Sequence, residues 1–223
     1  MKFYQKIDGA VHVSAREYDV AYNADIKEGQ LVKLSEGLVT AAATNETGAL
    51  LGIAAETHSG AADALDPRAN GTKLMVIDDP DVVMQCKAPE VAALEGTATT
   101  LPVTVLKAFA ADDFNGGYVK LVSKAEGSTN TDAIGTVRRI TDFAPDDATP
   151  TKGILTLESG GAPYAGDVYA VFPPIGFAKG SLSADGCALT LDACANLPLK
   201  VVGHDRAFGK INLIACKHVF AVN

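Results

Sequence analysis

Short apolar runs separated by turn residues recur along almost the whole chain. Each run resembles a β-strand, and Gly, Asn, Asp and Pro fill the gaps between runs. No long window shows helical periodicity, and the one helical candidate, residues 87–96, is short. The pattern predicts an all-β barrel or sandwich rather than alternating β-α units. The runs are QLVKL, LLGIAAE, KLMVIDD, VVMQCKA, PVTVLKAF, YVKLVSK, AIGTVRRI, GILTLES, DVYAVFPP, CALTLDA, LKVVGHD and INLIACKHVFAV.

Two of these runs repeat almost letter for letter, which indicates an internal duplication. EGQLVKLSEGLVTAA begins at Glu28, and NGGYVKLVSKAEG begins at Asn115. Four blocks then match in the same order in both halves. The alternative is that any two β-rich stretches with glycine turns align this well. The matched positions are Gly29 with Gly116, Gly52 with Gly135, Gly71 with Gly153, and Asp81 with Asp167.

The repeat suggests a division of the chain into three parts. Residues 1–27 are predicted to form an extended N-terminal arm, residues 28–110 a first small β-barrel or β-sandwich unit, and residues 111–223 a second unit with C-terminal closing strands. In each copy a glycine lies inside an apolar strand, at Gly52 and Gly135. Such glycines are expected at bulges, at barrel bends or where two backbones approach closely.

Two aromatic segments are candidates for binding a partner. The predicted arm carries Tyr4, Tyr18 and Tyr22, whose burial against a neighbouring subunit or against the chain's own barrel would anchor it. The segment YAVFPPIGFAKG carries Phe172 and Phe177, which either project into a partner or cover one end of a barrel.

The charge of the chain disfavours nucleic acid as a partner. Its formal net charge is −8 and its sequence pI is about 4.9, whereas binding to a phosphate backbone depends on Lys and Arg. The pair Arg138-Arg139 is too short to form a basic patch and is expected on the surface of one strand. No run approaches the ~20 apolar residues of a membrane span, and the N-terminus lacks the apolar core of a signal peptide, so no membrane partner is expected.

The four cysteines lack the Cys-x-x-Cys spacing of zinc sites and redox motifs. We expect buried free thiols, with a Cys187 to Cys194 bridge as the alternative. Synthesis in a reducing cytoplasm fits this composition best.

Catalytic motifs are not evident in the sequence. It contains no nucleophile elbow, phosphate loop, His-Glu-x-x-His pair or dinucleotide fingerprint, and its four histidines are dispersed. The acidic run at Asp78, Asp79 and Asp81 is expected to be a turn around Pro80 rather than a cation site. His204 and Asp205 are expected to lie in a hairpin that ends at Gly209 rather than to act as an acid–base pair. We therefore predict no enzyme activity, cofactor or metal.

The segment IKEGQLVKLSEGLVTAAATNETGALLGIAAETHSG resembles the core of bacteriophage capsid decoration, or cement, proteins. The similarity covers about residues 26–90 and, more weakly, 115–175. It implies a virion component that binds the outside of the major capsid protein lattice, stabilises the head and associates with copies of itself there. No catalytic residues come with the resemblance. The length of the chain, its second copy and its N-terminal extension depart from the family pattern.

Three other functions stay open at this stage. Repeated small β-barrels also build other virion parts, such as a head fibre base, a tail tube or an adaptor. A carbohydrate-binding module would use exposed aromatic rings, but the chain has no Trp and only six Tyr. An enzyme assembled from dispersed residues such as His204, Asp205 and Asp78 would require a polar pocket with shifted pKa values.

Overall fold

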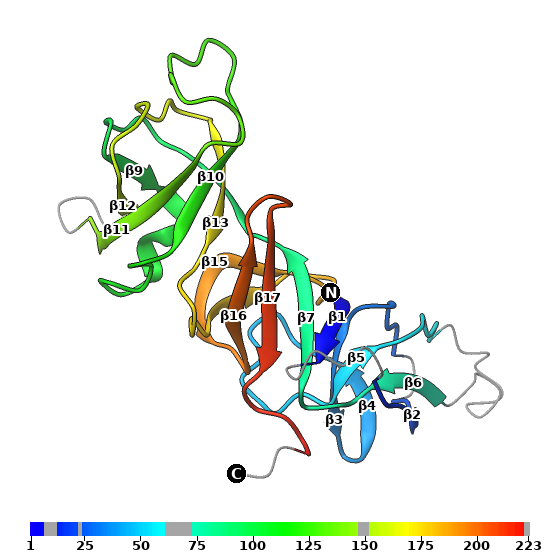
Figure 1. Ribbon diagram of the computed structural model, residues 1–223. Helices are drawn as coiled ribbons and strands as arrows, with labels where there is room; N and C mark the ends of the chain where they lie inside the picture. Colours follow the sequence, from blue (N-terminus) through cyan, green and yellow to red (C-terminus); the bar gives the residue numbers. More distant parts are fainter. Residues whose placement is uncertain (7–12, 22–23, 61–72, 147–151, 221–223) are drawn as a thin grey trace.

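The computed structural model describes residues 1–6, 13–21, 24–60, 73–146 and 152–220 (Figure 1). It confirms the all-β prediction, because 48% of the chain is strand and 3% is helix. The strands form several antiparallel sheets, and none of these sheets closes into a barrel within the described part of the chain. The predicted barrel is therefore absent there, and open sheets packed on one another take its place.

The N-terminal half forms a five-stranded sheet in the order β2-β6-β5-β3-β4. Alternating burial along β6, with Leu74 and Val76 inside, places one face of this sheet on a small core of its own. The strands are β2 (Ala15–Asp19), β3 (Leu31–Ser35), β4 (Leu38–Ala41), β5 (Gly52–Ala54) and β6 (Lys73–Ile77).

A four-stranded sheet joins the two ends of the chain, in the order β1-β7-β17-β16. β7 comes from the N-terminal half and pairs with β17 near the C-terminus, where Ile211 lies opposite Cys86. In Figure 1 this sheet lies between the five-stranded sheet and a six-stranded sheet formed by the middle of the chain. Its strands are β1 (Lys2–Lys6), β7 (Val82–Lys87), β16 (Leu199–Asp205) and β17 (Lys210–Ala215).

The middle of the chain forms a six-stranded sheet in the order β8-β13-β10-β11-β12-β9. The 3-10 helix η1 (Thr104–Ala108) follows β9, and a separate hairpin joins β14 (Lys179–Leu182) to β15 (Leu189–Asn196). The strands of the large sheet are β8 (Glu90–Ala92), β9 (Thr100–Val103), β10 (Tyr118–Ser123), β11 (Val137–Pro145), β12 (Gly153–Leu157) and β13 (Val168–Phe172).

One continuous apolar core connects the six-stranded sheet, the four-stranded sheet and the β14–β15 hairpin. It includes an aromatic cluster in which Phe114 packs edge-on against Phe109 and Phe143. Phe177 joins this cluster, with its ring centroid 5.3 Å from that of Phe114. Edge-to-face packing of this kind adds stability beyond the burial of apolar area.

The strands of the first three matched sequence blocks follow the same order in both copies. The N–H of Gly29 donates to the Ala54 carbonyl at 2.9 Å, and the N–H of Gly116 donates to the Ile140 carbonyl at 3.0 Å. Both glycines have a positive φ, which glycine adopts at little cost. The order β3-β5-β6 in one copy corresponds to β10-β11-β12 in the other. The fourth block differs, because β7 pairs with β1 and β17, whereas β13 pairs with β10 and β8.

Gly52 and Gly135, the two glycines inside matched apolar runs, have different surroundings. Gly52 lies in β5, and a Cβ there would sit 2.0 Å from the carbonyl oxygen of Ile77. This is the close backbone approach that the sequence predicts. Gly135 lies instead in the turn before β11, and no atom lies within 4 Å of its would-be Cβ. The strand pairing matches Gly52 with Arg138 instead of Gly135. Val32 of the first copy pairs with Gly52, and the matched Val119 of the second copy pairs with Arg138.

The strand pairing bears on the predicted division of the chain. The boundary at residue 110 falls inside the six-stranded sheet, which takes β8 and β9 from before it and β10 to β13 from after it. The described parts of residues 1–27 lie against the same chain, because β1 pairs with β7 and β2 pairs with β6. The C-terminal strand β17 lies between β16 and β7, and β7 belongs to the predicted first unit.

Candidate interaction surface

The residues predicted to bind a partner lie in two separate regions. Tyr4 belongs to β1, and Tyr22 falls outside the described residues. Tyr18 lies on β2, where its hydroxyl donates to a carboxylate oxygen of Asp78. Burial, together with that hydrogen bond, raises the pKa of Tyr18 to about 12.

The two phenylalanines lie inside the molecule. Phe172 is fully buried at the end of β13, and Phe177 is buried in the aromatic cluster. The exposed apolar residue of this segment is Ile175, with 62% of its surface accessible. Ile175 and Pro174 line a shallow depression of about 400 Å³ beside the ion pair between Lys179 and Asp113, whose atoms are 2.6 Å apart.

The most exposed large apolar side chains of the described residues are Phe208 and Ile134, with 77% and 63% of their surface accessible. Phe208 lies at the tip of the β16–β17 hairpin, and Ile134 lies in the loop between β10 and β11. Both line one depression of about 430 Å³, whose floor includes Lys120 and Val122 of β10 and Ala170 of β13. We call this depression the Ile134–Phe208 surface.

The hairpin tip that carries Phe208 is held against the six-stranded sheet. The ammonium group of Lys120 donates to the carbonyls of Arg206 and Ala207, at 3.0 and 2.8 Å. The guanidinium of Arg206 lies over the ring of Tyr118, 4.1 Å from its centroid, in cation–π geometry. Asp205 accepts a hydrogen bond from the N–H of Phe208. Phe208 therefore projects from a fixed turn.

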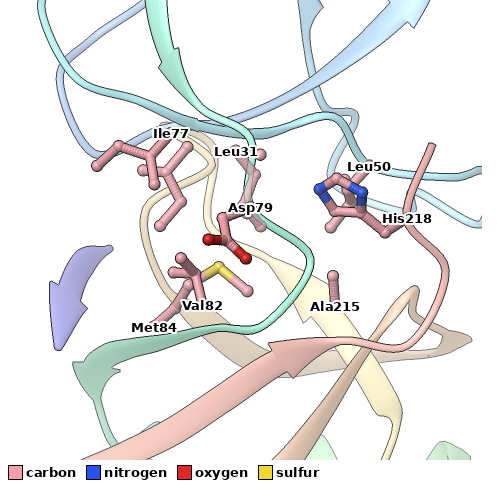
Figure 2. Close-up of a pocket in the computed structure, with 10 residues that line it drawn as sticks. Leu31, Leu50, Ile77, Asp79, Val82, Met84, Ala215 and His218 are labelled. Carbon is pink, nitrogen blue, oxygen red and sulfur yellow. The ribbon is translucent and has the colours of Figure 1, made fainter. Parts of the chain in front are cut away.

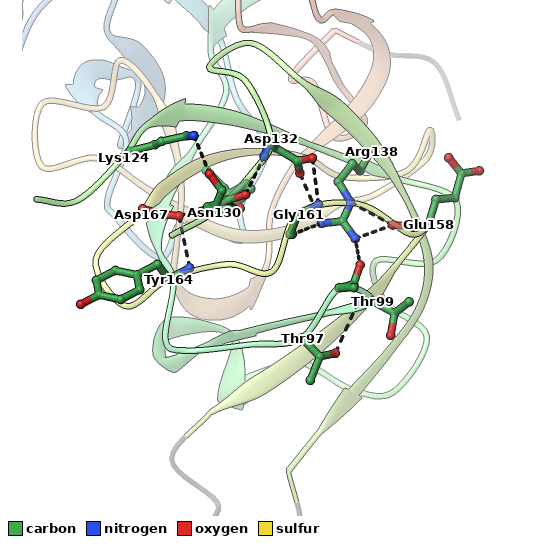
Figure 3. A network of polar contacts seen from close by, with 12 residues as sticks. Thr97, Thr99, Lys124, Asn130, Asp132, Arg138, Glu158, Gly161, Tyr164 and Asp167 are labelled. Carbon is green, nitrogen blue, oxygen red and sulfur yellow. Dashed lines mark hydrogen bonds and ion pairs between the residues drawn. The ribbon is translucent and has the colours of Figure 1, made fainter. Parts of the chain in front are cut away.

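The loop that carries Ile134 is anchored by a buried polar network (Figure 3). Asp167 is fully buried and accepts hydrogen bonds from the Ala125 N–H, the Ser128 hydroxyl, the Asn130 amide and the Tyr164 N–H. Burial alone would raise the pKa of Asp167, but these hydrogen bonds lower it overall. The buried carboxylate thus stays ionised and ties residues 125–130 of this loop to the loop between β12 and β13.

Arg138 completes this anchor and corrects one prediction. The sequence predicts an exposed pair at Arg138-Arg139, yet Arg138 is buried while Arg139 points outward. Its guanidinium donates to the carbonyls of Glu158 and Gly161, at 2.8 and 2.9 Å, and lies 3.5 Å from a carboxylate oxygen of Asp132 (Figure 3). A buried arginine with these acceptors fixes neighbouring loops, because each unpaired donor would carry a desolvation cost.

His204 has a structural position beside this surface. Its Nε2 lies 2.6 Å from the Pro173 carbonyl, and its ring packs edge-on against Tyr118 and Phe172. Burial lowers the pKa of His204, although the Pro173 hydrogen bond opposes the shift. The predicted hairpin is confirmed, since β16 and β17 pair on either side of residues 206–209.

The other candidate chemical groups lie apart from one another. The acidic run forms the predicted turn, in which the Asp81 N–H donates to a carboxylate oxygen of Asp79. The described residues contain no group of three or more His, Cys, Asp and Glu side chains suited to a metal ion. All four cysteines are free thiols, although Cys86 alone is fully buried. No helix in the described ranges is long and apolar enough to cross a membrane.

Comparisons with known proteins give no identification. No protein-family model, no curated protein and no solved structure matches the chain. Sequence reasoning missed Ile134 and Phe208, although both stand beside glycine turns, at Gly135 and Gly209, where an apolar side chain is hard to bury. That local signal would have identified both positions.

Proposed function

We propose that this protein is a non-enzymatic structural component of a phage virion, and that it binds the outside of the major capsid protein lattice and stabilises the head. The observation that carries the proposal is the Ile134–Phe208 surface. Two exposed apolar side chains from distant parts of the chain line one depression, and each is held by a defined set of buried or charged contacts. Preorganised apolar anchors of this kind suit protein–protein contact.

Three further features support a structural role. The resemblance of residues 26–90 to decoration proteins suggests the virion, and the net charge of −8 favours solubility and a protein partner over nucleic acid. The surface also has charged groups beside its apolar anchors, because Lys87 and Glu90, ion-paired at 2.8 Å, line the same depression, and protein interfaces combine apolar and polar groups in this way. Contact with copies of itself on the lattice is part of the proposal.

The tandem arrangement also belongs to this proposal. The equivalent hydrogen bonds of Gly29 and Gly116 and the shared strand order β3-β5-β6 and β10-β11-β12 support a duplicated three-stranded unit. The different pairing of β7 and β13 would then be the point where the copies diverged. Two related units in one chain would present two similar faces to a lattice. An arm role for residues 1–27, with Tyr4, Tyr18 and Tyr22 as anchors, stays a prediction.

Binding to particles tests the proposed surface. Purified wild-type protein and two double variants are mixed with particles that lack the protein and are then sedimented. Ile134→Ser with Phe208→Ser removes the two anchors, whereas Leu38→Ser with Leu94→Ser changes two apolar residues that are also exposed but lie elsewhere.

We expect the control variant to sediment like the wild type and the anchor variant to lose at least about tenfold in affinity. Circular dichroism should show that both variants are folded. Equal binding of all three proteins would contradict the assignment of the surface. Failure of the wild-type protein to bind would contradict the virion proposal itself.

A further inference from the structure

A small pocket lies where the C-terminal segment meets the junction of two sheets. Leu31, Leu50 and Ile53 line it from the five-stranded sheet and its loops, and Met84 and Ala215 line it from the four-stranded sheet. Figure 2 shows the side chains of Asp79 and His218 on the wall of this otherwise apolar pocket. Its volume is about 10 Å³, which is the least room that holds a water molecule.

His218 presents an unsatisfied polar atom to this pocket. The side chain is buried, with 7% of the residue's surface accessible, and Nε2 has no hydrogen-bond partner among the described residues. The Leu51 backbone lies near the ring, but no hydrogen bond of normal geometry joins it to Nε2. A buried donor left in this state costs free energy, and an ordered water is the usual remedy.

The other ring nitrogen fixes the proton on Nε2. Nδ1 accepts a hydrogen bond from the N–H of Phe220 at 3.1 Å, so the neutral ring carries its proton on Nε2. A water in the pocket would accept from Nε2 and donate to an Asp79 carboxylate oxygen. Protonation of Nδ1 would place two donors face to face and break the bond to Phe220.

His218 also belongs to a short segment that is docked by few contacts. The Leu50 N–H donates to the Lys217 carbonyl at 3.0 Å, and the Val219 N–H donates to the Leu50 carbonyl at 2.9 Å. The Cys216 N–H donates to the Pro198 carbonyl. The segment Cys216–Phe220 is thus tied to the loop before β5 by the β-bridge between Leu50 and His218 and by the Lys217 side chain, which donates to the Thr47 carbonyl.

We propose that this pocket binds one water molecule that joins Nε2 of His218 to Asp79, and that the segment Cys216–Phe220 stays docked only while His218 is neutral. Acid would therefore release the segment from the loop around Leu50. This release of the segment by acid does not depend on the proposed virion role.

Charged groups approach the ring from several sides. Asp78, Asp79 and Asp81 of the β6–β7 turn favour the protonated ring, whereas burial, the larger effect, lowers the pKa of His218. Arg16 of β2 lies over the ring of Phe220, 5.7 Å from its centroid, and Lys217 donates to the Thr47 carbonyl. Arg16 also lies 3.3 Å from a carboxylate oxygen of Asp78.

Amide hydrogen exchange of the intact chain between pH 7.5 and 5 tests the release. After correction for the intrinsic pH dependence of exchange, protection of the Val219 and Leu50 amides should fall up to about 30-fold, the limit set by an ordinary histidine pKa of about 6.5 in the released segment. The Ala88 amide, which donates to the Gly209 carbonyl, is the internal control for global unfolding, and its protection should fall less than that of Val219 and Leu50.

The variant His218→Gln should remove the pH dependence, because an amide neither gains nor loses a proton in this range. The matched variant His204→Gln should keep it. Protection of Val219 that does not change with pH in the wild type, or that falls equally in His218→Gln, would overturn the release. If His218→Gln does not fold, the comparison of Val219 with Ala88 in the wild type decides.

Nuclear magnetic resonance of the ring tests the water. At pH 7.5 we expect the proton on Nε2 and a nuclear Overhauser contact between that proton and a slowly exchanging water. A proton on Nδ1, or a direct hydrogen bond from Nε2 to a protein atom without a water contact, would overturn the hydration site.

Discussion

The amide nitrogen of Asn130 lies 2.9 Å from a carboxylate oxygen of Asp167 and 2.8 Å from the hydroxyl of Tyr169, and all three side chains are buried. One amide thus joins the carboxylate that anchors the β10–β11 loop to an aromatic residue of the core. The position of Ile134 at the end of this loop depends on that network.

Replacing Asp167 with Asn should destabilise the protein by about 2 to 4 kcal/mol, because the carboxylate accepts four hydrogen bonds and an amide group would turn donors toward donors. Urea unfolding measures the change. Asp192→Asn, on the exposed side of β15, is the control and should change stability by less than about 0.5 kcal/mol. Equal effects of the two substitutions would show that the network does not support the loop.

Replacing Gly52 with Ala should cost about 3 kcal/mol or more, because the new methyl group would overlap the Ile77 carbonyl oxygen of β6. Gly135→Ala meets open space and should cost only about 1 to 2 kcal/mol, which reflects its positive φ. Thermal unfolding of both variants checks this order. Equal losses of stability in Gly135→Ala and Gly52→Ala would contradict the different surroundings of the two glycines.

Stability should decrease as the pH falls below about 6.5. The pKa values of His204 and His218 are lowered by burial, so the unfolded chain binds protons that the folded chain does not. Their contribution to stability is complete above the unfolded pKa and is lost as the pH falls toward the folded pKa. Urea unfolding at pH 7.5 and pH 5 measures the loss, and the double variant His204→Gln with His218→Gln should reduce it.

Deletion of residues 1–22 should destabilise the fold. It removes β1 and β2, and with them the Tyr18–Asp78 hydrogen bond and the buried Val20. Circular dichroism and thermal unfolding give the result, and deletion of residues 1–6 alone, which removes only β1, is the milder comparison. A chain without residues 1–22 that is fully folded but no longer self-associates would instead support the predicted arm.

The local parts of the fold could be predicted from the sequence. Apolar runs between turn residues predicted most of the strands, Pro80 predicted the turn in the acidic run, and Gly209 marked the end of the β16–β17 turn. Two predictions were wrong, because the run PVTVLKAF continues from β9 into the 3-10 helix η1, and the helical candidate at residues 87–96 contains the strand β8. These features depend on neighbours along the chain, so a single sequence contains them.

Pairing between distant strands could not be predicted in the same way. The pairing of β7 with β17 brings Cys86 beside Ile211, and nothing near either residue in the sequence indicates its partner. Burial of Arg138 depends on the carbonyls of Glu158 and Gly161, which come from a distant part of the chain. The sequence around Arg138 and Arg139 does not show these acceptors, so both arginines were predicted to be exposed. The depression that Ile134 and Phe208 share likewise depends on loops that only the assembled sheets bring together.

The copy number of this protein in purified particles from its source tests the central claim most directly. Quantitative mass spectrometry of the particles would count it against the major capsid protein. Our account predicts many copies in a fixed ratio to the capsid subunits, as lattice decoration requires. A few copies per particle would place the protein at a vertex, portal or tail instead, and complete absence from the particles would contradict the virion proposal.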